Sequence, residues 1–364
     1  MDKVIKDAIL AQEKGCISYK DFMELALYHP SLGYYNRSSQ KIGKKGDFYT
    51  SSNVGEVFGR ALGRLFVHLF ESHEIQTTII ELGGGTGRIA QSILRYIQTK
   101  NHPLFLKISY IIIESSPYHQ LSQQKHLSEF TNVKYMNSLE HVDKLDGIVF
   151  SNEFFDAFPV HVIEKDNHEL AEVMITVKND LFVEQLQPLQ NKEILSYLQK
   201  HRFDLQPKQR LEIPLAMEDY FYKLCEKIQK GFLLTIDYGY TNQEWRNIVH
   251  REGSLRGYGR HQMFRHILEQ PGEIDITTHI HWDTLMAAPL QTLSFLPQDE
   301  FLISCGLLED LQSSTSKDPF AAEHKQNRAI RTLLQAGQIS SYFYTLLQAK
   351  NVRSSSAKLF PYVK

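Results

Sequence analysis

The sequence has few cysteines and no long apolar run. Its 364 residues include three cysteines, which are too few and too scattered for a disulfide framework or a zinc site. We expect Cys16, Cys225 and Cys305 to behave as small apolar residues in a reducing compartment. No uninterrupted apolar run approaches the roughly 20 residues that span a bilayer. The first ten residues, MDKVIKDAIL, also lack a signal-peptide pattern, so the sequence predicts a cytoplasmic protein with no membrane segment.

The sequence also lacks an excess of charge of either sign. It has 40 basic and 42 acidic residues, and its formal net charge is -2. Nucleic-acid-binding proteins usually carry a basic excess or a basic stripe, so this balance argues against a nucleic-acid partner. The basic stretch KIGKKGD, residues 41–47, is interpreted as a solvated loop.

From residue 77 onward, short apolar runs alternate with helical patterns. Each run ends in a polar cluster: TTIIEL, KISYIIIESS, NVKYMNS, DGIVFSNE and GFLLTIDYG. This alternation is typical of a Rossmann-like α/β fold with a parallel sheet and right-handed crossovers. Ligands of such sheets bind at the carboxyl ends of the strands, where these polar clusters lie.

The pattern predicts four regions along the chain. Residues 1–75 form an N-terminal helical and lid region, in which the capping box SYKD marks the start of one helix. Residues 76–153 together with residues 231–284 form the sheet core. Residues 154–230 form an inserted α+β subdomain on the substrate side, with a hairpin turn at Asn179 and Asp180. Residues 285–364 are predicted to be mostly helical, with Gly337 ending a helix.

Two further segments lie in the second half of the chain. GSLRGYGRHQ is predicted to be a loop, and GEIDITTHIHW a strand that places His279 and His281 on one face. With no third ligand evident, we interpret these two histidines as structural rather than metal-binding.

The glycine loop IIELGGGTGRIA is the strongest chemical signal. Gly83, Gly85 and Gly87 form an E-x-G-x-G-x-G pattern between a predicted strand and a predicted helix. Glycines there allow a tight turn and a close approach of the backbone to a ligand. A glycine turn needed only for packing is the structural alternative.

Two acidic residues near this loop bear on the choice of cofactor. The glycine spacing alone also satisfies the dinucleotide fingerprint, so NAD stays open as an alternative. Glu81 would repel a pyrophosphate but would attract the sulfonium and amino groups of S-adenosylmethionine, which this residue therefore favours. Glu114 ends the next apolar run, where it is placed to accept hydrogen bonds from ribose hydroxyl groups of either cofactor.

The segment SNEFFDAFPV follows another predicted strand. On a turn, Glu153 and Asp156 lie on one side, where carboxylates would orient a cationic nucleophile and stabilise its developing charge. Phe154, Phe155 and Phe158 would then exclude water from the pocket. The structural alternative is a turn with a cap at Asp156. SNEFF is also similar to the [DN]-P-P-[YF] loop of the methyltransferases that modify amino groups of nucleic acids, but both prolines of that loop are absent here.

Several segments together resemble one family. GDFYTSSNVGEVFGRALG, IELGGGTGRIAQSIL, SNEFFDAFPVH, LLTIDYG, GSLRGYGRH and PGEIDITTHIHW occur in the order found in the MidA-like methyltransferases. That family includes a mitochondrial complex I assembly factor that methylates arginine. The resemblance, over about residues 15 to 310, implies a class I, seven-strand-type fold that uses S-adenosylmethionine.

The resemblance also implies site residues. Those expected to bind the cofactor are Gly46, Asp47, Phe48, Thr50, Glu81, Gly83, Gly85, Gly87, Glu114, Asn152 and Glu153. Independently of the resemblance, the residues themselves indicate Glu153 and Asp156 as the catalytic candidates, and Phe155, Tyr238, Arg256 and His261 as the candidates for binding substrate. No metal is implied.

The leading functional expectation is methylation of a protein, with arginine as the acceptor. A small-molecule methyltransferase, and a binding or assembly factor without catalysis, remain the alternatives. The sequence does not identify the acceptor or the oligomeric state, although the predicted helical tail offers a surface for a homodimer.

Overall fold

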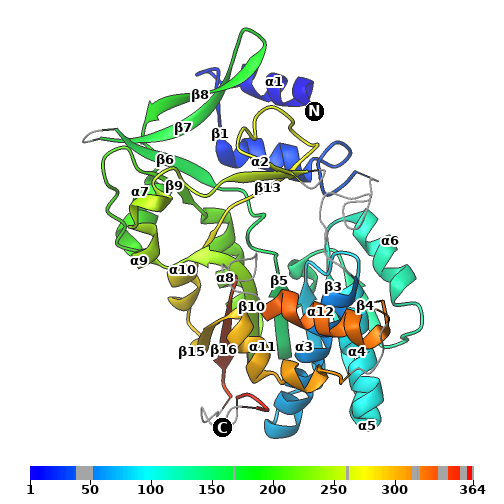
Figure 1. Cartoon of the computed structure of the whole chain (residues 1–364). Coiled ribbons are helices and arrows are strands. Elements are labelled where there is room, and N and C mark those ends of the chain that lie inside the picture. The colour runs from blue at the N-terminus through cyan, green and yellow to red at the C-terminus, as the bar shows by residue number, and fades with distance from the viewer. Residues whose placement is uncertain are drawn as a thin grey trace. The chain divides into compact units, whose positions relative to one another are not determined.

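The structure is a computed structural model of the chain (Figure 1). It describes residues 1–37, 52–166, 169–259, 262–313, 318, 320–334, 343–352 and 359–362. The chain divides into two compact units, each described separately below. The parallel unit comprises Thr50–Phe154, Leu224–Tyr238 and Pro289–Lys364, and the antiparallel unit comprises Met1–Tyr49, Phe155–Lys223 and Gly239–Ala288. The domain boundaries predicted from the sequence remain a prediction.

The parallel unit is built on a path of seven strands in the order β15-β16-β10-β5-β2-β3-β4. They are β2 (Thr78–Leu82), β3 (Ser109–Ile113), β4 (Val133–Met136), β5 (Leu145–Asn152), β10 (Ile228–Tyr240), β15 (Gln291–Pro297) and β16 (Phe343–Lys350). The five strands from β10 to β4 are parallel, whereas β16 is antiparallel to both β10 and β15. The α/β fold class predicted from the sequence is confirmed.

Helices supply the other half of this core. They are α3 (Ser52–Ser72), α4 (Arg88–Lys100), α5 (His102–Phe105), α6 (Pro117–His126), η1 (Leu139–His141), α11 (Gln298–Ser304), η3 (Leu307–Asp310) and α12 (Ala322–Leu334). α8 (Leu215–Lys227), most of which belongs to the antiparallel unit, leads into β10. On α3, Leu62, Leu65 and Phe66 recur at helical spacing and are fully buried. Phe66 packs on Phe150 of β5 with ring centroids 5.3 Å apart. Burial of each such side chain contributes about 1.5–3 kcal/mol.

The prediction of a mostly helical C-terminal region is wrong for two segments. β15 and β16 pair in the sheet, and β16 lies between β10 and β15 with most of its residues buried. Its sequence FYTLLQAK ends in good helix formers, but burial in the sheet outweighs that local preference. Gly337 lies outside the described residues.

The antiparallel unit contains a five-stranded sheet in the order β1-β7-β6-β9, with β8 paired to β7. The strands are β1 (Ile17–Ser18), β6 (His161–Asp166), β7 (Glu169–Lys178), β8 (Leu181–Pro188) and β9 (Arg210–Ile213). The hairpin predicted at Asn179 and Asp180 is confirmed: both residues have positive φ, 50° and 69°, as a tight hairpin turn requires. Helix α7 (Lys192–Lys200) follows, and β9 lies between α7 and α8 in the sequence.

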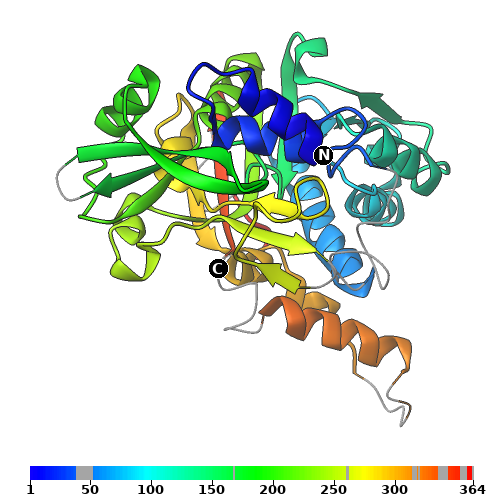
Figure 2. The ribbon, with the colours of Figure 1, turned by 90° about the horizontal axis from the view of Figure 1, so that it is seen from above.

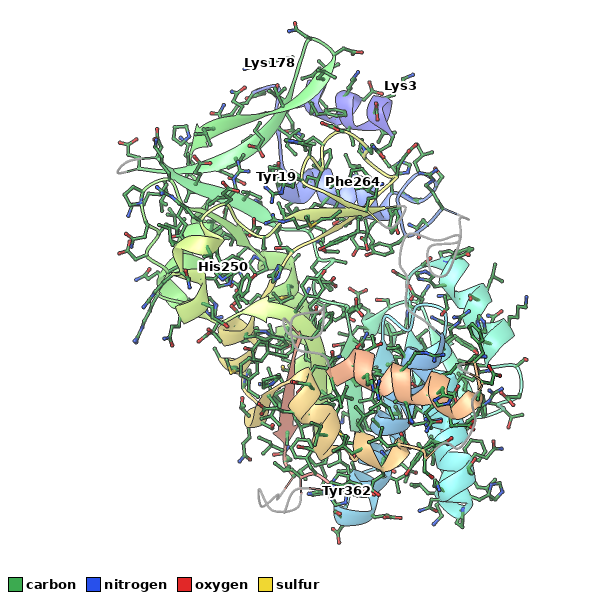
Figure 3. All side chains as sticks on the ribbon, in the orientation of Figure 1. Lys3, Tyr19, Lys178, His250, Phe264 and Tyr362 are labelled. Carbon is green, nitrogen blue, oxygen red and sulfur yellow. The ribbon has the colours of Figure 1, made fainter. Side chains whose placement is uncertain are left out.

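The N-terminal helices pack on this sheet. In Figure 2, α1 (Asp2–Leu10) and α2 (Tyr19–Tyr28) lie against β7. The predicted cap is present, because the Ser18 hydroxyl accepts a hydrogen bond from the Asp21 amide at 3.1 Å. Tyr19, labelled in Figure 3, donates its hydroxyl to Glu184 of β8. Side-chain contacts therefore join α2 to the hairpin.

The predicted loop GSLRGYGRHQ contains strands instead. β11 (Arg256–Gly259) pairs with β12 (Gln262–Phe264) and β13 (Asp275–Thr277) in a separate small sheet. Glycine is rare in strands, but a Cβ on Gly257 would lie 2.6 Å from the Cδ1 atom of Ile274. The predicted strand GEIDITTHIHW forms two short strands, β13 and β14 (Ile280–His281), and α10 (Trp282–Met286) follows them. The short helices α9 (Asn242–Trp245) and η2 (Ile248–His250) precede β11 in the sequence.

The three cysteines are free and buried, in agreement with their predicted apolar role. Within the described residues, no helix has both the length and the apolar character needed to cross a bilayer.

Candidate functional site

The glycine loop connects β2 to α4 in the parallel unit. Gly83, Gly85 and Gly87 all have positive φ, at 66°, 49° and 81°, which L-residues with a side chain rarely adopt. A Cβ on Gly83 would lie 2.5 Å from Phe154 Cδ2, whereas a Cβ on Gly85 would meet no atom within 4 Å. Gly83 is therefore required for packing, and Gly85 faces open space where a ligand has access to the backbone.

Glu81 lies near the end of β2 and is 3% exposed. The Tyr110 hydroxyl on β3 donates a hydrogen bond of 2.9 Å to its Oε2 atom. Burial raises the pKa of Glu81 to about 7; the hydrogen bond from Tyr110 opposes this rise and the nearby charge of Glu114 adds to it. A cation bound beside Glu81 would stabilise its ionised form.

Glu114 directly follows β3, also at the carboxyl end of a parallel strand. It is 8% exposed. Its Oε1 atom accepts a hydrogen bond from the Ser116 amide at 2.9 Å, and its Oε2 atom lies 3.5 Å from His119 Nδ1. The carboxylate is thereby held in place at the start of α6.

Asn152 and Glu153 end β5 on the other side of β2. Glu153 has a φ of 49°, and its amide donates to the Ile236 carbonyl of β10 at 3.0 Å. The Asn152 side chain donates to Glu153 Oε1 at 3.3 Å. A glutamate with positive φ is strained, so the local structure holds this exposed side chain in a conformation that few residues adopt.

Sequence reasoning missed two residues that hold these segments. Asp237, fully buried near the end of β10, accepts hydrogen bonds from the amides of Phe154 at 3.3 Å and Tyr238 at 2.9 Å. It ends the apolar run FLLTID, the same signal that identified Glu81 and Glu114.

The second missed residue is Gln123 of α6, which is fully buried. Its side-chain nitrogen donates to the Gly85 carbonyl at 2.9 Å, while its Oε1 atom has no hydrogen-bond partner among the described residues. Nothing in the sequence distinguishes Gln123 from the other polar residues of its helix. The buried acceptor and the open space at Gly85 fit a ligand with hydrogen-bond donors.

Part of the predicted site lies outside the described residues. This applies to Gly46, Asp47, Phe48, Thr50 and His261. Their assignment to cofactor or substrate remains a prediction.

The other predicted substrate and catalytic residues are distributed over both units. In the parallel unit, the ring of Tyr238 packs edge-on against Phe343, 5.2 Å between centroids. In the antiparallel unit, Phe155 is 1% exposed and packs on Phe221 at 5.6 Å, as a core residue does. Asp156 is 4% exposed and its carbonyl accepts the Thr278 amide at 2.9 Å.

Arg256 belongs to β11 in the antiparallel unit and is half-buried. Its guanidinium donates to the carbonyl of Leu255 at 2.7 Å. The roles predicted for Phe155, Asp156, Tyr238 and Arg256 remain predictions.

The two histidines of the THIHW segment lie inside the antiparallel unit. His281 Nδ1 lies 2.9 Å from the Tyr197 hydroxyl, and His279 stacks on Tyr240 with ring centroids 4.4 Å apart. Burial lowers the pKa of both to about 3, so they are uncharged at neutral pH. The described residues contain no group of three or more metal-ligating side chains placed to hold an ion.

Comparison with known proteins identifies relatives. Residues 61–296 match the profile of a family described as "Putative S-adenosyl-L-methionine-dependent methyltransferase". A zebrafish (Danio rerio) protein named "Protein arginine methyltransferase NDUFAF7, mitochondrial" is 27% identical over 84% of this chain and 77% of its own length. The Drosophila melanogaster homolog of that protein is 25% identical over 73% of this chain and 65% of its own.

One solved structure is similar along almost the whole chain. It is a Burkholderia thailandensis protein bound to S-adenosyl-homocysteine. The two share a TM-score of 0.85 at 22% sequence identity, over 99% of this chain and 95% of the other. This likeness supports the Rossmann-like class I fold.

The curated relatives contradict the predicted cytoplasmic location, because their names place them in mitochondria. Scarce, unpaired cysteines indicate a reducing environment and do not distinguish one reducing compartment from another.

Proposed function

The chain belongs to the family of S-adenosyl-L-methionine-dependent methyltransferases whose profile it matches, and from that premise we propose that it methylates arginine in a protein substrate. The proposal of arginine is supported by the names of relatives that resemble this chain over most of its length. The small-molecule and non-catalytic alternatives become outcomes of the test below.

The observation that carries the cofactor assignment is the pair of buried acids beside the glycine loop. Glu81 and Glu114 lie at the carboxyl ends of adjacent parallel strands, and a Cβ on Gly85, in the loop between β2 and α4, would meet no atom within 4 Å. Glu81 would repel a pyrophosphate and attract a ligand with a sulfonium and an amino group, whereas Glu114 can accept hydrogen bonds from the ribose of either cofactor. The residues present therefore fit S-adenosylmethionine.

When bound, the cofactor would supply the methyl group of its sulfonium for in-line displacement by the acceptor nitrogen, which loses a proton while S-adenosyl-homocysteine leaves. Alignment of the acceptor then determines the rate. Glu153 follows β5 and is held by the hydrogen bond from its amide to the Ile236 carbonyl and by the one that its carboxylate accepts from Asn152. Its carboxylate would orient the acceptor guanidinium and stabilise the charge that develops on it. Asp156 is the second candidate for that role.

The test uses the full chain and a cell lysate with tritiated S-adenosylmethionine. We expect label in a protein band and, after hydrolysis, in methylarginine. Glu153→Gln keeps the size of the side chain and should reduce labelling by about a hundredfold, because a preorganised charge contributes a few kcal/mol. Glu140→Gln, an exposed acid of η1, is the matched control and should leave labelling unchanged.

Three results would contradict the proposal in different ways. Label in lysine, or only in small molecules, would reject arginine in a protein. Binding of NAD but not S-adenosylmethionine in calorimetry would reject the cofactor assignment. Cofactor binding without any labelled acceptor would favour a non-catalytic binding protein.

A further inference from the structure

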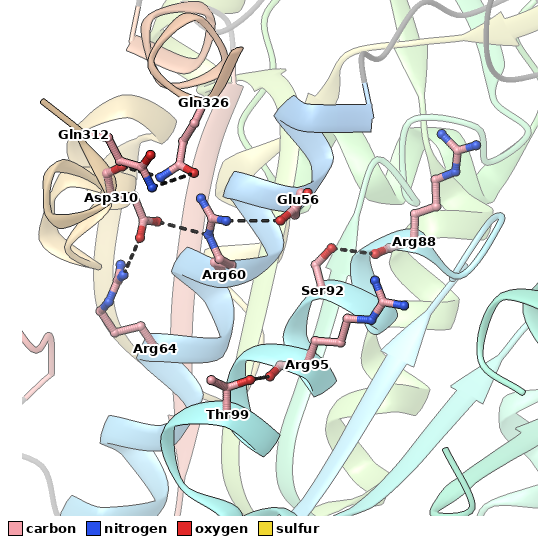
Figure 4. A network of polar contacts seen from close by, with 10 residues as sticks. All are labelled: Glu56, Arg60, Arg64, Arg88, Ser92, Arg95, Thr99, Asp310, Gln312 and Gln326. Atoms are coloured by element: carbon pink, nitrogen blue, oxygen red, sulfur yellow. Dashed lines mark hydrogen bonds and ion pairs between the residues drawn. The ribbon is translucent and has the colours of Figure 1, made fainter. Parts of the chain in front are cut away.

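A polar groove lies on the parallel unit, and its lining residues are different from those assigned to the cofactor. α3 and α4 form two of its walls, and residues of η3, of the segment after η3 and of α12 form a third (Figure 4). Its volume is about 800 Å³. Its lining residues are Glu56, Arg60, Arg64, Arg88, Gln91, Ser92, Arg95, Tyr96, Thr99, Lys100, His126, Glu309, Asp310, Gln312, Gln326 and Tyr362.

Basic side chains predominate in this groove, although the whole chain has a net charge of -2. Five lining residues are arginine or lysine and three are aspartate or glutamate. On α4, Arg88 and Arg95 lie two turns apart on one face, and Arg60 and Arg64 lie one turn apart on α3. Such a concentration of like charge favours the binding of an anion.

Two of the three acids of the groove are already paired with the arginines of α3. Arg60 pairs with Glu56 at 3.1 Å, and Arg64 pairs with Asp310 at 3.1 Å (Figure 4). Arg64 also lies over the Tyr96 ring, 5.3 Å from its centroid. These contacts fix the floor of the groove and leave the arginines of its rim to other partners.

Several donors of the groove remain available. Within the described residues, the side chains of Arg88 and Lys100 are exposed and form no ion pair. Arg95 pairs with Glu129 at 2.7 Å, but both side chains are about half exposed, so the pair contributes little and exchanges readily. The Nη2 atom of Arg60 is shielded from solvent and has no hydrogen-bond partner in the described part of the chain. A buried donor of this kind favours an additional acceptor in the groove.

We propose that this groove binds an acidic segment of a partner protein. Carboxylates match the planar fork of arginine in a bidentate contact. The Ser92 and Thr99 hydroxyls already donate to the carbonyls of Arg88 and Arg95, and their oxygens can still accept hydrogen bonds from peptide amides. A nucleic-acid partner fits less well, because the whole chain has no basic excess. This docking does not depend on which residue the enzyme methylates.

The experiment measures the binding of a fluorescein-labelled peptide of alternating glutamate and serine to the full chain by fluorescence anisotropy. We expect binding that weakens as the salt concentration rises. The triple variant Arg88→Glu, Arg95→Glu, Lys100→Glu should weaken binding by about tenfold or more, because each reversed charge removes an attraction and adds a repulsion.

A matched triple variant reverses three exposed lysines of the same unit outside the groove: Lys107→Glu, Lys134→Glu and Lys144→Glu. It changes the net charge by the same amount and should keep wild-type affinity. Thermal melting and calorimetry with S-adenosyl-homocysteine verify that both triple variants fold. If the groove variant fails to fold, the single change Arg95→Glu on the exposed face of α4 replaces it and should weaken binding about threefold.

Three outcomes would overturn the proposal. The first is that the peptide fails to bind the wild-type chain at low salt. The second is that the two triple variants lose affinity for the peptide equally. The third is that a single-stranded oligonucleotide of the same length displaces the peptide and binds more tightly, which would indicate a nucleic-acid partner instead.

Discussion

At the scale of single residues, Glu81 combines a stability cost with a binding role. A carboxyl group that is almost fully buried favours its protonated form, and the pKa of Glu81 rises from 4.5 to about 7. Because the folded state holds this proton more tightly than the unfolded state, the contribution to stability is complete below about pH 4.5. It is lost as the pH rises from there to about 7. At pH 8 the ionised Glu81 therefore destabilises the unliganded protein.

The variant Glu81→Gln should separate these two effects. Glutamine imitates the protonated acid and still accepts the hydrogen bond from Tyr110. At pH 8 we expect the unliganded variant to be more stable than the wild type, by up to about 3 kcal/mol, and its stability to vary less between pH 5 and pH 8. Affinity for S-adenosylmethionine should fall by at least about tenfold, because the attraction to the cofactor's positive charge is lost.

Chemical denaturation at the two pH values and calorimetry with the cofactor measure both effects. A variant that loses stability and affinity together would show that Glu81 has only a structural role. Wild-type affinity in the variant would instead remove Glu81 from the cofactor site. Glu140→Gln, at an exposed acid, should change neither quantity.

At the scale of elements, the glycine loop provides a comparison between two neighbouring positions. Gly83→Ala introduces a methyl group 2.5 Å from the Phe154 ring at a φ of 66°. It should lower the free energy of unfolding by about 2–4 kcal/mol, since both the backbone conformation and the overlap are unfavourable. Gly85→Ala meets no atom within 4 Å and carries only the backbone cost, about 1–2 kcal/mol.

Cofactor affinity should respond in the opposite order to stability. A methyl group at Gly85 occupies the open space at the loop, so we expect Gly85→Ala to bind S-adenosylmethionine at least about tenfold more weakly than the wild type does. Its melting temperature should nevertheless be higher than that of Gly83→Ala. Thermal melting and calorimetry measure the two quantities. Wild-type affinity in Gly85→Ala would mean that the open space is not part of the cofactor site.

The sheet core and its strand-end acids could be predicted from the sequence because apolar runs that end in an acid form a local pattern. Glu81 and Glu114 were found in this way. Gln123 could not be, because its role depends on the carbonyl of Gly85, which lies 38 residues away in sequence. β11 was missed for a similar reason. The Ile274 side chain leaves no room for a Cβ at its glycines, and a contact between residues distant in sequence leaves no local signal.

At the scale of the whole molecule, the end of the chain completes the sheet that holds the site. β16 follows β10 by more than a hundred residues, yet it pairs with β10 over eight residues from Gly231 to Tyr238. Without β16, the last parallel strand would expose a long apolar edge. The C-terminal region is therefore part of the core of the parallel unit and is not a separate addition to it.

The variant Leu347→Asp tests this integral role. Leu347 is 1% exposed and lies opposite Leu234 of β10, so the substitution places an unpaired charge in the core. We expect a loss above about 4 kcal/mol, which is a large fraction of the roughly 5–15 kcal/mol that stabilises a typical domain, and therefore little soluble protein and a much lowered melting transition in circular dichroism. The control Leu311→Asp lies in the same region at a position that is 51% exposed, and it should stay within about 0.5 kcal/mol of the wild type. A Leu347→Asp protein that melts like the control would show that the C-terminal strand is dispensable for the parallel unit, and the sheet from β10 to β4 would then have to be stable with β10 as its edge.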